Sequence, residues 1–148
     1  MATVKTNIDK VMQKIASKFD LLKDREYFLR PLAIETIPNM KERIHRDGKA
    51  TDGGAIGTYS SGYMRERERN NRSKDTKIIV SLTRQLENDW AVIGTSRGYG
   101  IGFNNVFNAQ KSRWVEEIKK RIIFNLSAEE QEYIRLRITE LTDAAFNS

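Results

Sequence analysis

The stretch KIIVSLTRQLENDWAVIGTSRGYGIGF, residues 77–103, decides the fold of this chain. Its first apolar residues, at 78–82, are mostly β-branched and suit a pleated surface, so they predict a strand. Two leucines at helical spacing within 82–89 predict a short helical segment after that strand. The whole stretch is therefore expected to form the β-rich centre on which the helices pack.

The second half of this stretch predicts a hairpin. Segments 90–93 and 99–103 are apolar and flank a glycine-bounded turn at 94–98. In GYGIGF the glycines alternate with large side chains, so one face of the strand is bare backbone. We expect another segment to pack closely on that face. A phosphate-binding loop is a weaker interpretation, because the lysine and the Ser or Thr of a P-loop are missing.

Composition limits the classes of function. The 148 residues fit one domain, and the chain has no cysteine and a single histidine, His45. Little is therefore available for thiolate, metal or acid–base chemistry, and we expect a non-enzyme without a cofactor. The sequence has no apolar run of about 18 residues and no secretory signal, so we expect a cytoplasmic protein without a membrane partner. Its net charge of +6 favours an acidic partner, either nucleic acid or protein.

Apolar periodicity predicts helices at both ends of the chain. One is expected over 4–19 and a second over 24–44, with a break near 36–38 where Pro38 removes a backbone donor. Ser127 and Glu130 form a capping box that predicts the start of a last helix reaching to about residue 145.

A further helix is expected over 108–120, with Asn108 as its N-cap. Its apolar residues Trp114, Val115 and Ile118 are expected to face inward. Trp90 and Trp114 are each interpreted equally well as core residues or as contacts to a partner.

These elements predict a single α+β domain over residues 1–148. A small, mostly antiparallel sheet is expected to be packed by the N- and C-terminal helices, with a long extended arm at 46–75. The predicted core joins the hairpin to the last helix and consists of Trp90, Ile93, Ile101, Phe103, Ile134, Ile138 and Leu141.

The segment 46–75 is the candidate interaction site. It holds turn residues and no apolar periodicity, which predicts an arm that orders on docking, with Ser60 or Ser61 capping a short helix. Aromatic and arginine side chains are enriched in protein interfaces. The residues expected to contact partners are Tyr59, Tyr63, Arg65, Arg67, Arg69 and Arg72. The alternative is a solvated strip neutralised by Glu66 and Glu68.

The remaining polar candidates are expected to be structural. Glu87 with Asp89, and Glu116 with Glu117, are interpreted as surface charges rather than as a cation site. His45 is interpreted as a capping or surface residue rather than as a metal ligand.

The order of four motifs resembles a known family. DGGAIGTYSSGYMRER, KIIVSLTRQLENDW, GYGIGF and RIIFNLSAEEQEYI follow one another as in the tail-completion and virion-morphogenesis proteins of tailed bacteriophages, over about residues 45–135. The chain departs from that pattern at Arg84, where the family has glycine, and at 103–105, where it has a tyrosine–alanine pair. The matching positions are Gly57, Tyr59, Ser60, Tyr63, Arg65, Leu82, Thr83, Leu86, residues 98–103, Phe124, Leu126, Ser127, Glu129 and Glu130.

This resemblance implies a non-enzymatic structural protein of the virion, located at the head–tail junction or at the head-proximal end of the tail. It implies a ring subunit, such as a neck or tail-terminator component, assembled in the host cytoplasm. Its partners would be copies of itself and other neck, portal or tail proteins, with DNA passing through the lumen. The alternative function is a basic nucleic-acid-binding module that contacts phosphates without sequence specificity.

Overall fold

The fold is given by a computed structural model that describes residues 8–23, 25–72, 74–81, 84–95 and 98–147, without the side chains of residues 9, 18–23, 25–28 and 95. These parts contain helices and one antiparallel strand pair, so the predicted α+β class is confirmed. The elements are α1 (Ile8–Lys23), α2 (Arg25–His45), α3 (Ser61–Arg69), β1 (Trp90–Thr95), β2 (Gly98–Phe103), α4 (Val106–Lys119) and α5 (Ala128–Asn147).

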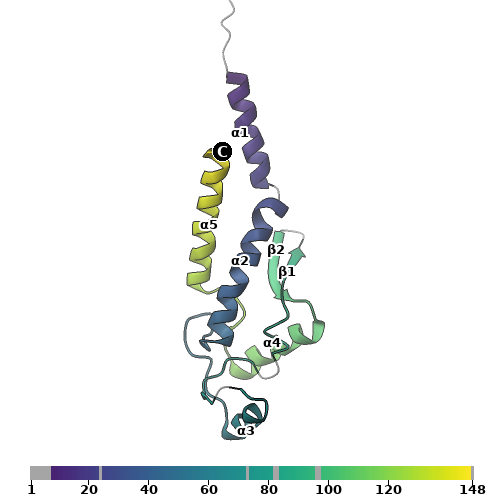
Figure 1. The fold of residues 1–148 in the computed structure, drawn as a ribbon, viewed down its shortest axis with the longest axis vertical. Coiled ribbons are helices and arrows are strands. Elements are labelled where there is room, and N and C mark those ends of the chain that lie inside the picture. The colour runs from purple at the N-terminus through teal and green to yellow at the C-terminus, as the bar shows by residue number, and fades with distance from the viewer. Residues whose placement is uncertain (1–7, 24, 73, 82–83, 96–97, 148) are drawn as a thin grey trace, which may run out of the picture.

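Helix α2 is the centre of an elongated molecule (Figure 1). The β1–β2 hairpin lies on one side of α2 and α5 lies on the other, and α2 contacts all three elements. Helix α1 projects beyond the body at one end, whereas α3 forms the opposite end. The molecule therefore has a packed middle and two protruding helical ends.

The predicted hairpin is present. β1 and β2 pair in antiparallel register, from Trp90 opposite Phe103 to Thr95 opposite Gly98. The predicted close packing on the glycine face is also present, because a methyl group built on Gly98 would lie 3.4 Å from Leu29 Cδ1 of α2. One built on Gly102 would lie 2.7 Å from the Ile93 side chain. The glycines thus let α2 and β1 approach the strand.

The strand predicted at 78–82 is wrong for its described part, 78–81. Ile78 N–H donates to the Gly57 carbonyl at 2.9 Å and Ile79 N–H to the Tyr59 hydroxyl at 3.1 Å, and Val80 has a left-handed φ of 49°. β-branched residues suit any buried segment, and here they pack without a partner strand. The helical segment predicted next is a single turn in its described part, 84–89, and its start at 82–83 lies outside the described residues.

The two N-terminal helices differ from expectation in one respect. Residues 4–7 of the first predicted helix lie outside the described residues, and α1 begins at Ile8. Helix α2 runs unbroken through both prolines, so the break predicted near 36–38 is wrong. Each proline removes one backbone hydrogen bond of the helix. The burial of a continuous face of α2 contributes more free energy than is lost with these bonds. That face consists of Leu32, Thr36, Met40 and Ile44.

The predicted start of α5 is confirmed by its capping box. Glu130 Oε2 accepts from Ser127 N–H at 2.8 Å, and Ser127 Oγ accepts from Glu130 N–H at 3.2 Å. Glu130 also pairs with buried Arg43 at 2.6 Å. Arg43 donates further to the carbonyls of Ile123 at 3.0 Å and Asn125 at 2.8 Å. This network ties the end of α2 to the start of α5.

The N-cap of α4 is Asn105 rather than Asn108. Asn105 Oδ1 accepts from Phe107 N–H at 2.8 Å, so α4 begins at Val106. Asn108 is buried instead and donates to Asp89 Oδ2 at 2.9 Å. Asparagine is a favoured N-cap residue, so the sequence alone allows either position. The side chain of Asn108 is instead bonded to Asp89, which leaves Asn105 as the cap.

The core lies at the lower end of α2. Its buried residues are Ile44, Ala50, Ile56, Ile78 and Ile123, with Tyr59, Val80, Trp90, Val115 and Phe124 packed around them. The predicted core was therefore only partly correct. Phe103 is buried and Trp90, Ile101, Ile134 and Leu141 are half-buried, but Ile93 and Ile138 are exposed.

The described parts of the segment 46–75, residues 46–72 and 74–75, fold over the lower end of α2 (Figure 1), although the segment was predicted as an extended arm. Ala50 and Ile56 are part of the core, and an isolated bridge joins Thr58 to Lys77. The segment therefore does bury apolar side chains, contrary to the inference from its composition. It is packed in this structure, and its behaviour on assembly stays a prediction.

Candidate interaction surfaces

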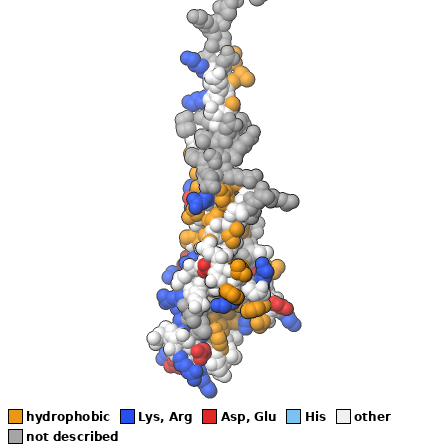
Figure 2. Space-filling view, turned by 90° about the vertical axis from the view of Figure 1, so that its right-hand side faces the viewer, with side chains coloured by type: hydrophobic (Ala, Val, Ile, Leu, Met, Phe, Trp, Pro, Cys, Tyr) orange, Lys and Arg blue, Asp and Glu red, His pale blue; other side chains and the backbone are white. Residues whose placement is uncertain are grey.

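The predicted cap of α3 is confirmed. Ser60 Oγ accepts from Tyr63 N–H at 3.3 Å, and the helix begins at Ser61. The rings of Tyr59 and Tyr63 lie 5.0 Å apart between centroids. α3 and Tyr59 thus bring the predicted interface residues into one end of the molecule, where Figure 2 shows Lys and Arg side chains gathered with a few acidic ones.

Two of the four arginines predicted to be exposed point inward. Arg67 is fully buried, with its guanidinium 4.5 Å from the Tyr59 ring centroid. It donates to the Ser81 carbonyl and, at 3.3 Å, to the Tyr59 hydroxyl. Arg72 donates to Ser81 Oγ and lies 3.7 Å from Glu87. The interpretation of Arg67 and Arg72 as exposed contact residues is therefore wrong, because they connect this end of the chain to Ser81 and Glu87.

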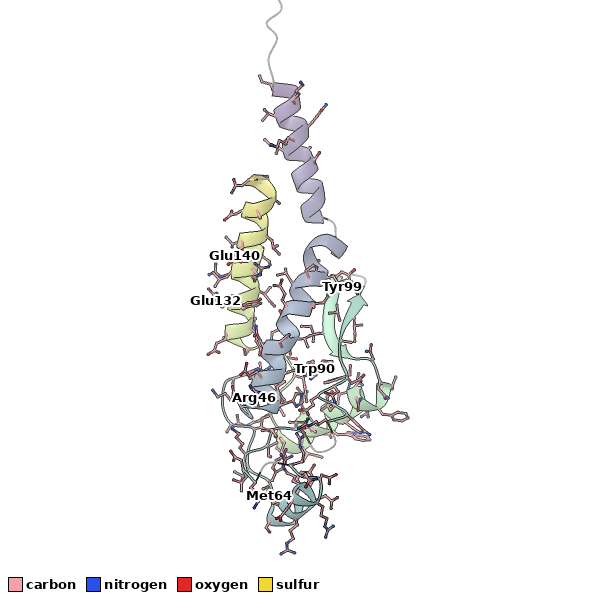
Figure 3. The ribbon with its side chains drawn as sticks, in the orientation of Figure 1. Arg46, Met64, Trp90, Tyr99, Glu132 and Glu140 are labelled. Carbon is pink, nitrogen blue, oxygen red and sulfur yellow. The ribbon has the colours of Figure 1, made fainter. Side chains whose placement is uncertain are left out.

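The outward part of the predicted strip is smaller. Arg65, Arg69 and Tyr63 are exposed, and Arg69 pairs with Glu66 at 3.1 Å. Met64, labelled at this end in Figure 3, is half-buried. Of the six candidate residues, Arg65, Arg69 and Tyr63 are the ones whose side chains are exposed.

Helix α4 exposes Trp114 and Ile118, which were predicted to face inward, whereas Val115, the third residue of that prediction, packs against the core. Phe107, Trp114 and Ile118 recur at steps of seven and four and are 76%, 53% and 72% exposed. Three aromatic and aliphatic side chains on one exposed stripe are typical of an interaction surface. We name these three residues the α4 face.

The inward side of α4 is polar, which explains its orientation. Asn108 bonds to Asp89, and Glu116 Oε1 accepts from Ile123 N–H at 2.9 Å and from Phe124 N–H at 3.0 Å. Ser112 is buried between them. The spacing of Asn108, Ser112 and Glu116 at steps of four is the sequence signal that could have identified the buried side.

Helix α1 carries a second unpartnered stripe. Ile8, Val11, Met12 and Ile15 are all exposed, although their spacing places them on one side of the helix. Figure 2 shows apolar atoms on one side of this projecting helix and lysines on the other. We name these four residues the α1 stripe.

An apolar groove of 820 Å³ lies between α2, β2 and α5. Leu32 and Met40 contribute from α2, Ile101 from β2, and Ile134 and Ile138 from α5. The groove exists because α5 and the hairpin stand on opposite sides of α2 and no described element closes the space between them. It explains why Ile138 is exposed although the helical pattern points it toward the sheet.

His45 is buried, so its interpretation as a surface or capping residue is wrong. Trp90 Nε1 donates to His45 Nε2 at 2.9 Å, and His45 Nδ1 lies 3.1 Å from the Ile79 carbonyl oxygen. Nε2 must accept, so Nδ1 carries the proton and donates. Burial lowers the pKa of His45, and the bond to the Ile79 carbonyl only partly opposes this effect. The neutral imidazole is therefore a structural link between α2 and β1.

Three of the four carboxylates interpreted as surface charges have structural partners, whereas Glu117 is exposed as predicted. Asp89 Oδ2 accepts from Asn105 N–H at 2.8 Å, and Glu87 lies 3.4 Å from Arg84. Glu116 Oε1 accepts from the backbone N–H groups of Ile123 and Phe124. In the described part of the chain no group of three or more acidic, His or Cys side chains is placed to hold a metal ion. None of the described helices has the length and apolarity needed to cross a membrane.

Comparison with protein-family models, with curated proteins and with solved structures gives no match.

Proposed function

We propose that this chain is a structural subunit of a tailed-bacteriophage virion, a tail-completion or head–tail joining component that acts within a ring. The observation that carries the proposal is the α4 face. Phe107, Trp114 and Ile118 are exposed together on one stripe, and an exposed apolar patch of this kind is typical of a surface that another protein covers. The motif order that resembles phage tail-completion proteins supplies the kind of partner.

The charge around the α4 face supports a partner with acidic side chains. Lys111 and Arg113 belong to α4, and Lys119, Lys120 and Arg121 follow at its end, against Glu116 and Glu117. Aromatic anchors inside a basic rim are typical of protein interfaces, where the anchors provide affinity and the charges orient the partner. We assign this surface to a neighbouring neck, portal or tail protein.

The alternative is a basic module that binds nucleic acid through phosphates. The net charge of +6 and the exposed Arg65 and Arg69 favour it. Phosphate binding would weaken steeply with added salt, whereas docking through the α4 face would depend mainly on its apolar side chains. Salt dependence therefore separates the two functions.

The test is complementation of a phage that lacks this protein with Trp114→Ser. We expect the variant to fold with the parent melting temperature, because Trp114 is half exposed, and to leave DNA-filled heads and unattached tails in electron micrographs of the lysate. The matched control is Leu136→Ser, an apolar position on α5 that is about equally exposed, at 50%, and lies outside this surface. Infectious particles at the parent yield with Trp114→Ser would overturn the joining role of this face.

A second comparison concerns α3. Arg65→Ala combined with Arg69→Ala removes the exposed arginines without disturbing buried Arg67. Loss of DNA affinity in this double variant, with normal particle assembly, would favour the nucleic-acid-binding alternative.

A further inference from the structure

We infer that a cavity beside α3, at the end of the molecule that this helix forms in Figure 1, binds one phosphate group. The cavity has a volume of 240 Å³ and is lined by Arg46, Arg67, Asp75, Lys77 and Ile79. Pockets for drug-sized molecules usually exceed about 300 Å³, so this cavity suits a small anion or the end of a larger ligand. The inference goes beyond the proposed function and does not depend on it.

Arg67 is a fully buried cation in the wall of this cavity, and half of its guanidinium has no partner. Its Nη1 donates to the Ser81 carbonyl and to the Tyr59 hydroxyl. In the described part of the chain, no group accepts a hydrogen bond from its buried Nε and Nη2. Buried charged groups in proteins are normally paired and hydrogen-bonded, and an anion in the cavity would pair with these two nitrogens.

The carboxylates at this end of the molecule are engaged with other cations. Glu66 pairs with Arg69 at 3.1 Å, and Glu87 lies 3.7 Å from Arg72. The burial of Arg67 is therefore not balanced by either of these two acidic side chains.

The two unpaired nitrogens are the ones that recognise an oxyanion. The N–H of Nε and one N–H of Nη2 lie side by side on one edge of the planar guanidinium and point the same way. This edge binds two oxygens of a phosphate or a carboxylate through two parallel hydrogen bonds. Nη1 is fixed by Ser81, and the guanidinium carbon of Arg67 lies 4.5 Å from the Tyr59 ring centroid. The free edge is thus held in one orientation before a ligand binds.

The charges of the lining favour a phosphate over a carboxylate. Arg46, labelled in Figure 3 directly after α2, and Lys77 are exposed, whereas Arg67 is buried. Asp75 accepts from the Lys77 backbone N–H at 3.0 Å and lies 3.7 Å from Lys77 Nζ. Three cations against one carboxylate give the lining a net charge of +2. A phosphate monoester, with a charge of about −1.5 to −2 at pH 7 and three acceptor oxygens, matches this charge better than a singly charged carboxylate.

Calorimetry of phosphate binding tests the inference. Inorganic phosphate is titrated into the full chain in a phosphate-free buffer at constant ionic strength. We expect saturable binding of one phosphate per chain, and an affinity at least about tenfold lower in Arg46→Ala combined with Lys77→Ala, because two of the three cations are removed. Both positions are exposed, so this double variant should keep the parent melting temperature.

The matched control is Arg65→Ala combined with Lys74→Ala. It removes the same two residue types from exposed positions that do not line the cavity. We expect its phosphate affinity to stay within about twofold of the parent, because charges far from the anion are screened by salt. Equal weakening in the two double variants would show attraction by net charge alone and would overturn the site.

A second measurement observes Arg67 without a substitution. The Nε–H signal of its side chain is assigned through the backbone by NMR and followed during the phosphate titration. We expect it to shift with the midpoint found by calorimetry. An Arg67 signal that stays unchanged while phosphate binds would place the anion elsewhere and overturn the inference.

Two further ligands separate the sources of the anion. Short duplex DNA that displaces inorganic phosphate would identify a backbone phosphate as the ligand, whereas DNA that does not displace it would identify free phosphate or a phosphate monoester, and either result supports the site. Sodium acetate that binds more tightly than phosphate would overturn the assignment and indicate an acidic side chain of a partner protein. The absence of saturable phosphate binding would overturn the site itself.

Discussion

His45 is the residue whose environment makes stability depend on pH. Its pKa is lowered in the folded chain, so the unfolded chain binds more protons as pH falls below the ordinary value of 6.5. Its contribution to stability is therefore complete above that pH and is lost as pH falls toward the folded pKa. Once Nε2 is protonated it has no lone pair to accept the Trp90 N–H, so that hydrogen bond is lost.

We predict that the melting temperature falls between pH 7.5 and pH 5 and that part of this fall disappears in His45→Gln. The glutamine amide retains one donor and one acceptor but does not titrate. Calorimetry across this range checks the prediction, and tryptophan fluorescence in a Trp114→Phe background gives a local readout from Trp90. An identical pH dependence in parent and variant would show that His45 is not the titrating group.

Arg67 and Arg65 provide a second comparison at the residue scale, because they are two positions apart in α3 and differ in exposure. Arg67 is fully buried against Tyr59 and Ser81, whereas Arg65 is exposed. Arg67→Ala should lower the free energy of unfolding by about 1.5–3 kcal/mol through lost hydrogen bonds of a charged group and lost packing.

Arg65→Ala should change it by less than about 0.5 kcal/mol. Urea denaturation of both variants measures the difference. Equal effects would mean that Arg67 is not the inward residue of α3.

At this scale the sequence identified residue types better than residue environments. Ser127 and Glu130 were recognised because a capping box is local, and the structure reproduces its two bonds. His45 and Arg67 were misplaced because their burial depends on Trp90, Ile79 and Ser81, which are distant in the sequence.

At the scale of elements, the segment that follows α4 shows how neighbouring positions divide between core and surface. Ile123 is fully buried in the core and adjacent Ile122 is 60% exposed. Truncating a buried isoleucine removes apolar contacts and leaves a cavity, whereas truncating an exposed one changes little.

We therefore predict that Ile123→Ala lowers the free energy of unfolding by about 2–5 kcal/mol. Ile122→Ala should stay within about 0.5 kcal/mol of the parent. Chemical denaturation of the two single variants gives the comparison directly. Comparable losses at both positions would contradict the described core. Ile138→Asp should be tolerated better than Ile123→Asp, because Ile138 lines the open groove although it was predicted to lie in the core.

Elements marked by a local sequence pattern, such as a cap or a regular spacing of glycines, were predicted correctly. Elements whose structure depends on distant contacts were not. The hairpin followed from alternating glycines, and α5 followed from its cap and its periodicity. In α4 the inward prediction was right for Val115 and wrong for Trp114 and Ile118, because the bonds of Asn108 and Glu116 turn the polar side of the helix inward. The strand at 78–81 failed because β-branched residues indicate burial and do not specify a pairing partner.

At the scale of the whole molecule, the apolar surfaces are divided between three places. The core at the lower end of α2 stabilises the chain, whereas the α1 stripe and the α4 face remain uncovered near opposite ends. Apolar surfaces of this kind are typical of a subunit that packs against neighbours in an assembly. They are consistent with the proposed role in a virion ring.

The central claim, that the chain is a structural component of the virion at the head–tail junction, is tested most directly by its location. Purified phage particles are separated into heads and tails, and each fraction is analysed by mass spectrometry for peptides of this chain. We expect these peptides in intact virions and in a fraction that retains the junction, at a constant ratio to the major tail protein across preparations. Their absence from washed virions, together with abundance in the soluble lysate, would contradict the claim.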